Sequence, residues 1–208
     1  GFPPGGPSTI IARHVADSLA STLGVTAIVE NRPGAGGRVA SDHVKRSGAD
    51  GRTLLVLAST STLKLEPGSG LVAIGRVSRF DFVFVQGKVF STKSLDGYVA
   101  TVRTRADVTT YTTPGTGTIP HLLMEELARM RNLPIRHVPF QGSGPAMQSV
   151  LGGHVGAALF GISEVQPAIE SGLVPLFVTG SERSAKLPNT PTLIDLGYHL
   201  DASGWHAL

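Results

Sequence analysis

The 208-residue sequence contains no cysteine and is poor in aromatic and charged residues. Without cysteine, disulfide bonds, thiol catalysis and cysteine-based zinc sites are excluded. Aromatic residues make up 6% and charged residues 16% of the chain, whereas hydrophobic residues make up 41%. A disordered chain would have more charge and fewer apolar residues, so we expect this chain to fold.

Long runs of charged or apolar residues are also missing. The formal net charge is only +3, and no basic run is longer than Lys45–Arg46. Nucleic-acid-binding proteins concentrate positive charge near stacking aromatic residues, so no nucleic-acid partner is expected. The longest apolar run, Leu54–Ala58, is too short to cross a bilayer and predicts a buried strand. No signal peptide is visible in this sequence, and we expect a mature or trimmed chain.

What the sequence does contain is an alternation of strand and helix patterns. Apolar residues spaced four apart predict a helix from a cap at Ser8 or Thr9 to Leu23, ended by Gly24. Further helices are expected at 39–46, 95–103, 121–131, 145–151 and 164–171, and strands at 25–30, 53–58, 81–85, 109–113, 135–140, 155–160 and 173–179. This alternation predicts an α/β fold with mostly parallel sheets flanked by helices.

Three glycine-rich loops, at residues 3–9, 31–37 and 113–118, each lead into a predicted helix. In a parallel sheet such loops emerge at the carboxyl ends of the strands, where ligands bind. The unpaired amides and the dipole of a helix N-terminus favour an anion, and two such ends would suit a dicarboxylate. The alternative, that these glycines only make turns, stays open for any single loop. Neither the dinucleotide-binding fingerprint nor a Walker A loop is present.

Several motifs, in order over almost the whole chain, resemble the substrate-binding proteins of tripartite tricarboxylate transporters, also called Bug or TctC-type receptors. These motifs are Phe2–Pro7, Ile11–Arg13, Val29–Gly37, Asp50–Leu55, Gly115–Thr118 with His121, His137–Gly142, Leu151–Gly153 and Ala185–Thr192. Each motif alone is weak evidence, whereas together they are specific.

The resemblance implies a two-lobed α/β periplasmic-binding-protein fold of type II, the Venus flytrap. Residues 1–83 and 180–208 would form lobe 1, and residues 84–179 would form lobe 2. Such a receptor is periplasmic and monomeric, captures a small organic carboxylate in the interlobe cleft and passes it to membrane transporter subunits. It is no enzyme and needs neither cofactor nor metal. Compared with family members, this chain is expected to have a lobe 1 that is incomplete at both ends.

The resemblance also implies a set of ligand-binding residues. They are expected in glycine-rich loops and at strand ends of both lobes, where backbone and hydroxyl groups meet the carboxylate. The residues matched by motif are Gly6, Ser8, Thr9, Ser59, Thr60, Thr113, Gly117, Thr118, His121, Phe140 and Gly142, and Phe160 is added as an apolar contact.

Two positions depart from the family pattern. Family members commonly have an aspartate where Thr9 stands, and often an Asp-Asn pair where Phe160 and Gly161 stand. An ammonium group needs anionic or carbonyl acceptors, so the loss of these carboxylates predicts a ligand without an amino group. An apolar or aromatic part of that ligand would lie against Phe160.

Individual polar residues favour no catalytic site. His121, in the first turn of its helix, could donate to a ligand oxygen or pin the loop, and both roles stay open. The adjacent Glu125 and Glu126 point in different directions on a helix and do not form an acid–base pair. Ser143 lacks the spacing of a hydrolase elbow. The alternatives to a transport receptor are a ligand-presenting sensor for a two-component system and, less favoured, an α/β enzyme acting on a carboxylate.

Overall fold

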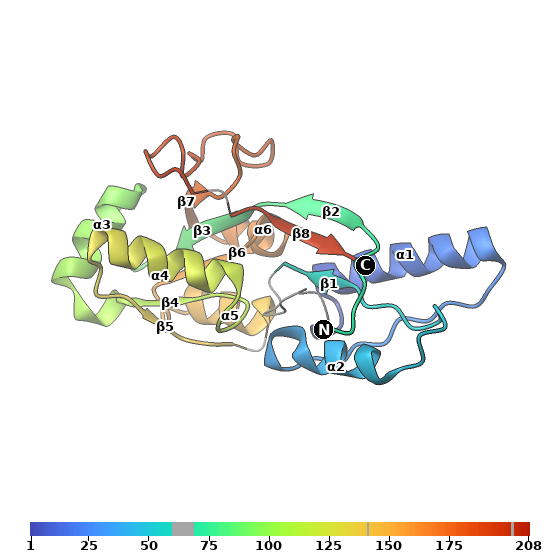
Figure 1. The fold of residues 1–208 in the computed structure, drawn as a ribbon. Helices are drawn as coiled ribbons and strands as arrows, with labels where there is room; N and C mark the ends of the chain where they lie inside the picture. The colour runs from blue at the N-terminus through green and yellow to red at the C-terminus, as the bar shows by residue number, and fades with distance from the viewer. Residues whose placement is uncertain (60–68, 141, 201) are drawn as a thin grey trace. The chain divides into compact units, whose positions relative to one another are not determined.

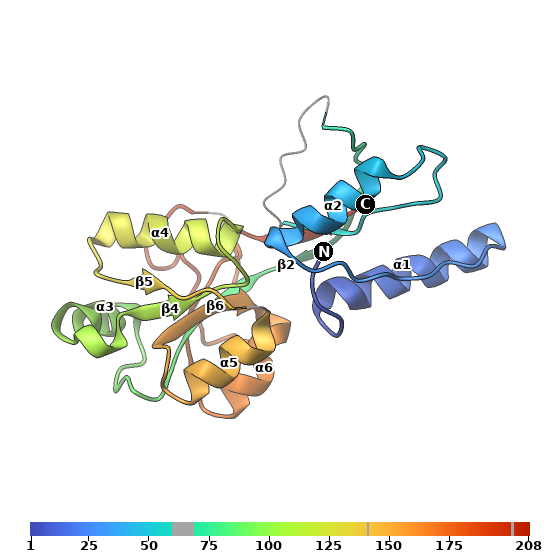
Figure 2. The same cartoon turned by 90° about the horizontal axis from the view of Figure 1, so that it is seen from below.

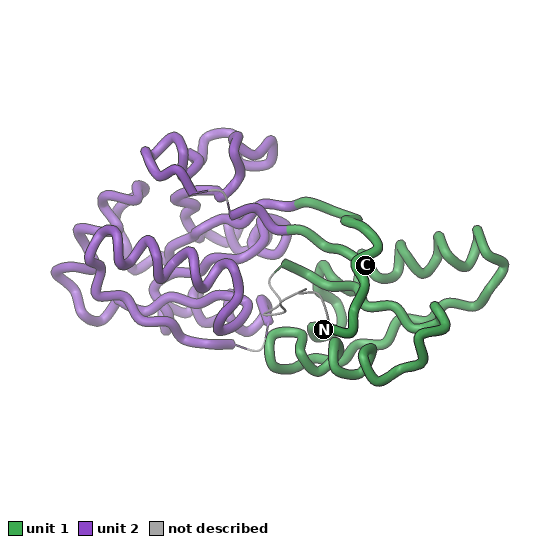
Figure 3. Tube along the Cα trace, in the orientation of Figure 1, with its two compact units in different colours: residues 1–79, 205–208 green, residues 80–204 purple. Residues whose placement is uncertain are grey.

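The computed structural model describes residues 1–59, 69–140, 142–200 and 202–208. The chain forms two compact units, shown in Figure 3: unit 1 comprises residues 1–79 and 205–208, and unit 2 residues 80–204. The sequence-based borders lay at 83 and 180, so residues 180–204 had been placed with the first lobe. They join unit 2 because Leu187 and Leu193 are buried in its core.

Unit 2 is built on a five-stranded sheet with the order β5-β4-β6-β3-β7 (Figure 1). The strands are β3 (Phe82–Gln86), β4 (Thr110–Thr112), β5 (Arg136–His137), β6 (Ala157–Gly161) and β7 (Val174–Val178). β4 pairs in parallel with β5 and β6, whereas β3 runs antiparallel to β6 and β7. The predicted α/β class is confirmed, and β3 is the one reversed strand of this five-stranded sheet within the described residues.

Helices cover both faces of this sheet. They are α3 (Leu95–Thr104), the short 3-10 helix η2 (Ala106–Val108), α4 (Ile119–Arg131), α5 (Ser143–Leu151) and α6 (Ile162–Glu170). Phe82 and Phe84 of β3 point into the core with α3 and α4, while Val83 and Val85 point into the core with α5 and α6. Successive strand residues face opposite sides, so the apolar run of β3 supplies both cores. Figure 2 shows α4 on one side of the sheet and α5 and α6 on the other.

Unit 1 contains less regular structure. Its elements are α1 (Pro7–Leu23), the 3-10 helix η1 (Ala35–Gly37), α2 (Arg38–Arg46), β1 (Leu57–Ala58), β2 (Arg76–Phe80) and β8 (Gly204–Ala207). The strands form a sheet with the order β1-β8-β2, in which β1 and β8 are antiparallel. β2 and β8 extend by one residue each into unit 2.

The predicted strand at 25–30 is wrong, and the predicted strand at 53–58 is shortened to Leu57–Ala58. Within the described ranges, the main-chain groups of residues 25–30 make no hydrogen bond. A strand exists only by pairing with a neighbour, and residues 25–30 pair with none of the described residues, so they form no strand.

The start of α1 also differs from the sequence-based expectation. Gly6 is the N-cap, Pro7 follows it, and neither Ser8 nor Thr9 caps the helix through its side chain. Proline suits the first helical position because the missing N–H would have no helical partner there, which shifts the helix start forward. The predicted end is confirmed: Gly24 adopts a left-handed conformation with φ 64°.

Candidate functional site

In unit 1, the predicted ligand residues lie around the first turn of α1. The buried Thr9 accepts a hydrogen bond at its Oγ1 from Asn31 Nδ2 at 2.8 Å, and the same amide nitrogen donates to the Phe2 carbonyl at 3.0 Å. Asn31 therefore ties the first glycine-rich loop to the helix. The Thr9 amide donates a hydrogen bond to the Gly6 carbonyl, whereas the Ser8 amide has no hydrogen-bond partner among the described residues.

The Ser8 hydroxyl belongs to a chain of side chains that the sequence motifs did not indicate. His206 of β8 lies between two hydroxyls, with Nε2 3.2 Å from Ser8 Oγ and Nδ1 2.8 Å from Ser78 Oγ of β2. Burial lowers the pKa of His206 to about 4. His206 lies 198 positions from Ser8, outside every recognised motif, so no local pattern could have found it.

Ser59 and Thr60 were predicted to follow a strand near the ligand. The Ser59 hydroxyl is buried and accepts from the Trp205 amide at 2.9 Å, while the Ser59 amide donates to the Trp205 carbonyl at 2.8 Å. Ser59 therefore extends the β1–β8 pairing by one residue. Thr60 lies outside the described residues.

In unit 2, the loop at 113–118 is closed by its own hydroxyl groups. Thr118, the N-cap of α4, donates its hydroxyl to the Gly115 carbonyl at 2.7 Å. Thr113 Oγ1 lies 2.9 Å from His137 Nε2 and 3.3 Å from the same carbonyl. Both threonines are fully buried. The hydrogen bonds of these two buried hydroxyls therefore fix the conformation of the loop.

His121 pins this loop, which is one of the two roles left open from the sequence. Its Nδ1 accepts from the Gly117 amide at 3.0 Å, so a neutral His121 carries its proton on Nε2, 3.6 Å from Glu125. The ring also lies 4.3 Å, centroid to centroid, from that of His137. Burial, followed by the nearby His121, lowers the pKa of His137 to about 4.

Some main-chain N–H groups at the start of α4 are not used by the hydrogen bonds within the loop. The Gly117 amide is taken by His121 and the Thr118 amide by Gly115. For Ile119 and His121, no acceptor for the main-chain N–H lies within the described parts of the chain. These two amides lie in the first turn, at the positive end of a 13-residue helix, and can donate to an anion.

The remaining predicted residues lie near the starts of α5 and α6. Gly142 caps α5 with φ 101°, a conformation that favours glycine, and Phe140 packs partly against the core beside α5. Phe160 is fully buried in that core, so in this conformation it offers no surface to a ligand. Glu164, which sequence analysis passed over, accepts from the Gly161 amide at 3.0 Å, and burial raises its pKa.

Unit 1 also contains a groove with a volume of about 790 Å³. One wall is the face of α1 carrying Val15 and Leu19, and the others include residues 25–32 and 51–56. The exposed fractions of Leu23 and Ile28 are 63% and 88%, because nothing among the described residues covers this face. The groove is mainly apolar, with Ser8 and Thr9 among its lining residues.

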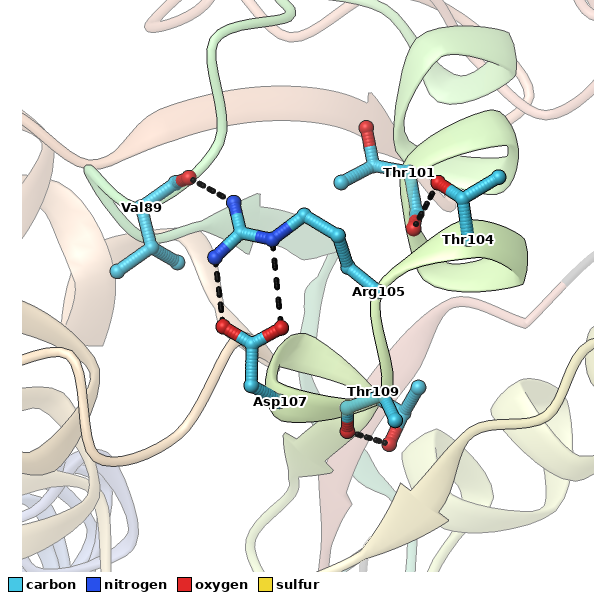
Figure 4. Close-up of polar contacts among 7 residues, drawn as sticks. Val89, Thr101, Thr104, Arg105, Asp107 and Thr109 are labelled. Atoms are coloured by element: carbon cyan, nitrogen blue, oxygen red, sulfur yellow. Dashed lines mark hydrogen bonds and ion pairs between the residues drawn. The ribbon is translucent and has the colours of Figure 1, made fainter.

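The polar cluster at the end of α3 offers no free cation to an anion. Figure 4 shows Arg105 bonded to both carboxylate oxygens of Asp107 and to the Val89 carbonyl, at 2.6, 3.3 and 3.2 Å. The guanidinium is already satisfied, and the pair links α3 to η2. No group of three or more potential metal ligands occurs in the described part of the chain.

Comparison with known proteins agrees with this architecture. A family model described as the tripartite tricarboxylate transporter family receptor matches residues 11–208. The chain belongs to this receptor family. The resemblance seen in the motifs is thereby confirmed, and the family and fold are those of periplasmic solute-binding receptors rather than enzymes.

Individual relatives show how much of this receptor the chain represents. BugT of Bordetella pertussis is 35% identical over 219 residues, which cover 100% of this chain and 67% of BugT. A Cupriavidus necator relative is 34% identical over 205 residues, which cover 95% of this chain but 62% of the relative. The receptor chain therefore spans about two thirds of the length of these relatives.

Solved receptor structures match nearly the whole chain. The periplasmic binding protein BugD is 28% identical with a TM-score of 0.84, covering 99% of this chain and 72% of BugD. MatC from Rhodopseudomonas palustris, determined with bound malate, is 25% identical with a TM-score of 0.85, covering 99% and 74%. A Rhodopseudomonas palustris protein with adipate shares the fold, with a TM-score of 0.86 and 24% identity. None of the helices described here is long and apolar enough to span a bilayer.

Proposed function

We propose that this receptor binds a small organic carboxylate in the periplasm, as a monomer, and delivers it to a tripartite tricarboxylate-type transporter. The observation that carries the proposal is the family match over residues 11–208, joined to the similarity with malate-bound MatC. The geometry supports it, because unpaired amides at Ser8 and at Ile119 and His121 offer donors to an anion within units 1 and 2 respectively.

The ligand would lack an amino group. Thr9 offers a neutral hydroxyl that already accepts a bond from Asn31, and Phe160 and Gly161 carry no charge. An ammonium group would find no carboxylate at these positions. Ligand contacts by the motif-matched residues are part of the same proposal: Gly6, Ser8, Thr9, Ser59, Thr60, Thr113, Gly117, Thr118, His121, Phe140 and Gly142.

Calorimetric titration tests the ligand class directly. Malate, adipate and citrate would be compared with glutamate and aspartate at one pH and salt concentration. We expect binding by at least one of the first group and none by the amino acids. Tight binding of glutamate or aspartate would contradict the proposal.

The Ile119 amide can be removed without losing the helix. Ile119 is the first helical residue and Thr118 before it is extended, with φ −75° and ψ 160°, so Ile119→Pro fits the backbone. Losing one charge-assisted hydrogen bond is expected to weaken carboxylate binding about 10- to 100-fold. Ile119→Ala is the matched control, because it trims the same side chain and keeps the amide. Equal affinities in the two variants would place the carboxylate elsewhere.

Delivery to a transporter has its own test. Uptake of the labelled carboxylate by cells that hold the transporter subunits should require this receptor. A receptor that binds the carboxylate but supports no uptake would contradict the transport role.

A further inference from the structure

The buried ring of His206 joins two serine hydroxyls within unit 1. His206 is 3% exposed, and its two ring nitrogens face Ser8 Oγ at 3.2 Å and Ser78 Oγ at 2.8 Å. The three residues come from α1, β8 and β2, and the two strands are neighbours in one sheet. The arrangement therefore links the first turn of α1 to the sheet.

A neutral histidine must treat these two hydroxyls differently. One ring nitrogen carries a hydrogen and donates, and the other accepts. Burial keeps the pKa of His206 at about 4, so the ring is neutral at pH 7. One serine must therefore donate its proton to the ring, and the other must accept a proton from it.

The two distances indicate which serine donates. The 3.2 Å from Nε2 to Ser8 Oγ lies within the usual range for an N–H donor but beyond that for an O–H donor, whereas the 2.8 Å from Ser78 Oγ to Nδ1 fits either donor. In this arrangement Ser78 donates to Nδ1, and Nε2–H donates to Ser8. The hydroxyl hydrogen of Ser8 then has no acceptor among the described residues.

The direction of these bonds matters because a carboxylate only accepts hydrogen bonds. If Ser8 donated its single hydrogen to His206, its oxygen would present only lone pairs, which repel an anion. We propose that His206 and Ser78 are positioning residues that keep the Ser8 hydroxyl hydrogen directed to a bound carboxylate. This inference rests on the proposed function, since it concerns how that carboxylate is held.

Nitrogen-15 NMR of protein labelled at histidine tests the direction of the bonds. His206 should carry its proton on Nε2, with Nδ1 unprotonated, before and after addition of the carboxylate found by calorimetry. Its resonances would be assigned with the His206→Gln variant. A proton on Nδ1 in the bound protein would overturn the inference.

Affinities of paired variants test the consequence for binding. Ser78→Ala removes the donor to Nδ1 and should weaken carboxylate binding about threefold to tenfold, while Ser78→Thr keeps a hydroxyl and should bind like the wild type. His206→Gln places an amide donor near the position of Nε2 and should retain the carboxylate affinity. His206→Leu has no such donor, and its carboxylate affinity should fall about tenfold. His14→Gln, at an exposed histidine of the same unit, should leave the carboxylate affinity unchanged.

The outcomes separate this inference from the proposed function. A wild-type protein that binds none of the carboxylates would overturn the proposed function and the inference with it. A wild type that binds, with Ser78→Ala folded and equally tight, would overturn the inference alone. A loss in Ser78→Ala that Ser78→Thr does not restore would also overturn it, because the hydroxyl would not be the cause.

Discussion

Units 1 and 2 contain similar apolar patterns but bury them very differently. In unit 2, Phe82–Val85 of β3 are completely buried between helices on both faces of the sheet. In unit 1, Ile28 is 88% exposed, and of the 17 residues of α1 only Thr9 is buried. A helix satisfies its own hydrogen bonds, so α1 forms without cover, whereas a strand needs a neighbour. The comparison shows that apolar periodicity alone does not produce a packed layer.

The largest expected difference between the units is in amide hydrogen exchange. Amides of β3 are bonded to β6 and β7 and should open only with unit 2 as a whole, whereas those of residues 25–30 have no acceptor in the described structure. Exchange of the first set should be slower by more than about a thousandfold. Exchange mass spectrometry measures this. Comparable protection of residues 25–30 would show that a partner covers them in solution.

Truncation of one apolar side chain in each unit should sharpen the contrast. Phe84 is fully buried and its ring lies 5.1 Å from Phe177, so Phe84→Ala should lower the free energy of unfolding by about 3–5 kcal/mol. Ile28→Ala in unit 1 should change it by less than about 0.5 kcal/mol. Denaturant unfolding followed by circular dichroism measures both. A large cost for Ile28→Ala would contradict the exposed position of that residue.

Acid should destabilise unit 1 through His206. Its pKa is lowered from 6.5 to about 4, so below pH 6.5 the unfolded chain binds a proton that the folded chain does not. The free energy of unfolding should therefore fall as pH drops from 6.5 to 4, by up to about 3 kcal/mol, and level off below that. Trp205, the single tryptophan, lies in unit 1 and reports its unfolding by fluorescence.

His206→Gln removes this titrating group and should flatten the pH dependence over the same range. His14→Gln, which changes an exposed histidine, should leave the dependence as it is in the wild type. His137 in unit 2 has the same direction of pKa shift but is only partly buried, so its share should be smaller. An unchanged pH dependence in His206→Gln would assign acid sensitivity to another group.

The smallest expected effect concerns the loop anchor in unit 1. Asn31→Asp keeps the shape of the side chain but removes the amide donor to Thr9 Oγ1 and to the Phe2 carbonyl. We expect a loss of about 1–2 kcal/mol in the stability of unit 1, with little change in unit 2. Trp205 fluorescence and far-ultraviolet circular dichroism, compared in one denaturant titration, separate the two. Equal losses by both probes would mean that the units unfold together.

Much of unit 2 could be predicted from the chain. The apolar runs of β3 and β6 and the apolar spacing on α4 were recognised, because burial on regular elements leaves a period in the sequence. Details that depend on neighbours were missed. The strand predicted at 135–140 is reduced to Arg136–His137. Pinning of the 113–118 loop by His121 was one of two roles left open from the sequence, whereas the contact between Thr113 and His137 was not predicted.

By itself the sequence determined the α/β class, the ends of helices such as Gly24, the absence of thiol chemistry and the receptor family. These follow from local properties, namely backbone conformation, composition and short motifs, which need no distant partner. Only the tertiary structure decided that residues 25–30 form no strand and that residues 180–204 join unit 2. It also decided that His206 meets Ser8 across 198 positions. Such pairings depend on which distant segments come together, and hydrogen bonds and burial exist only once they do.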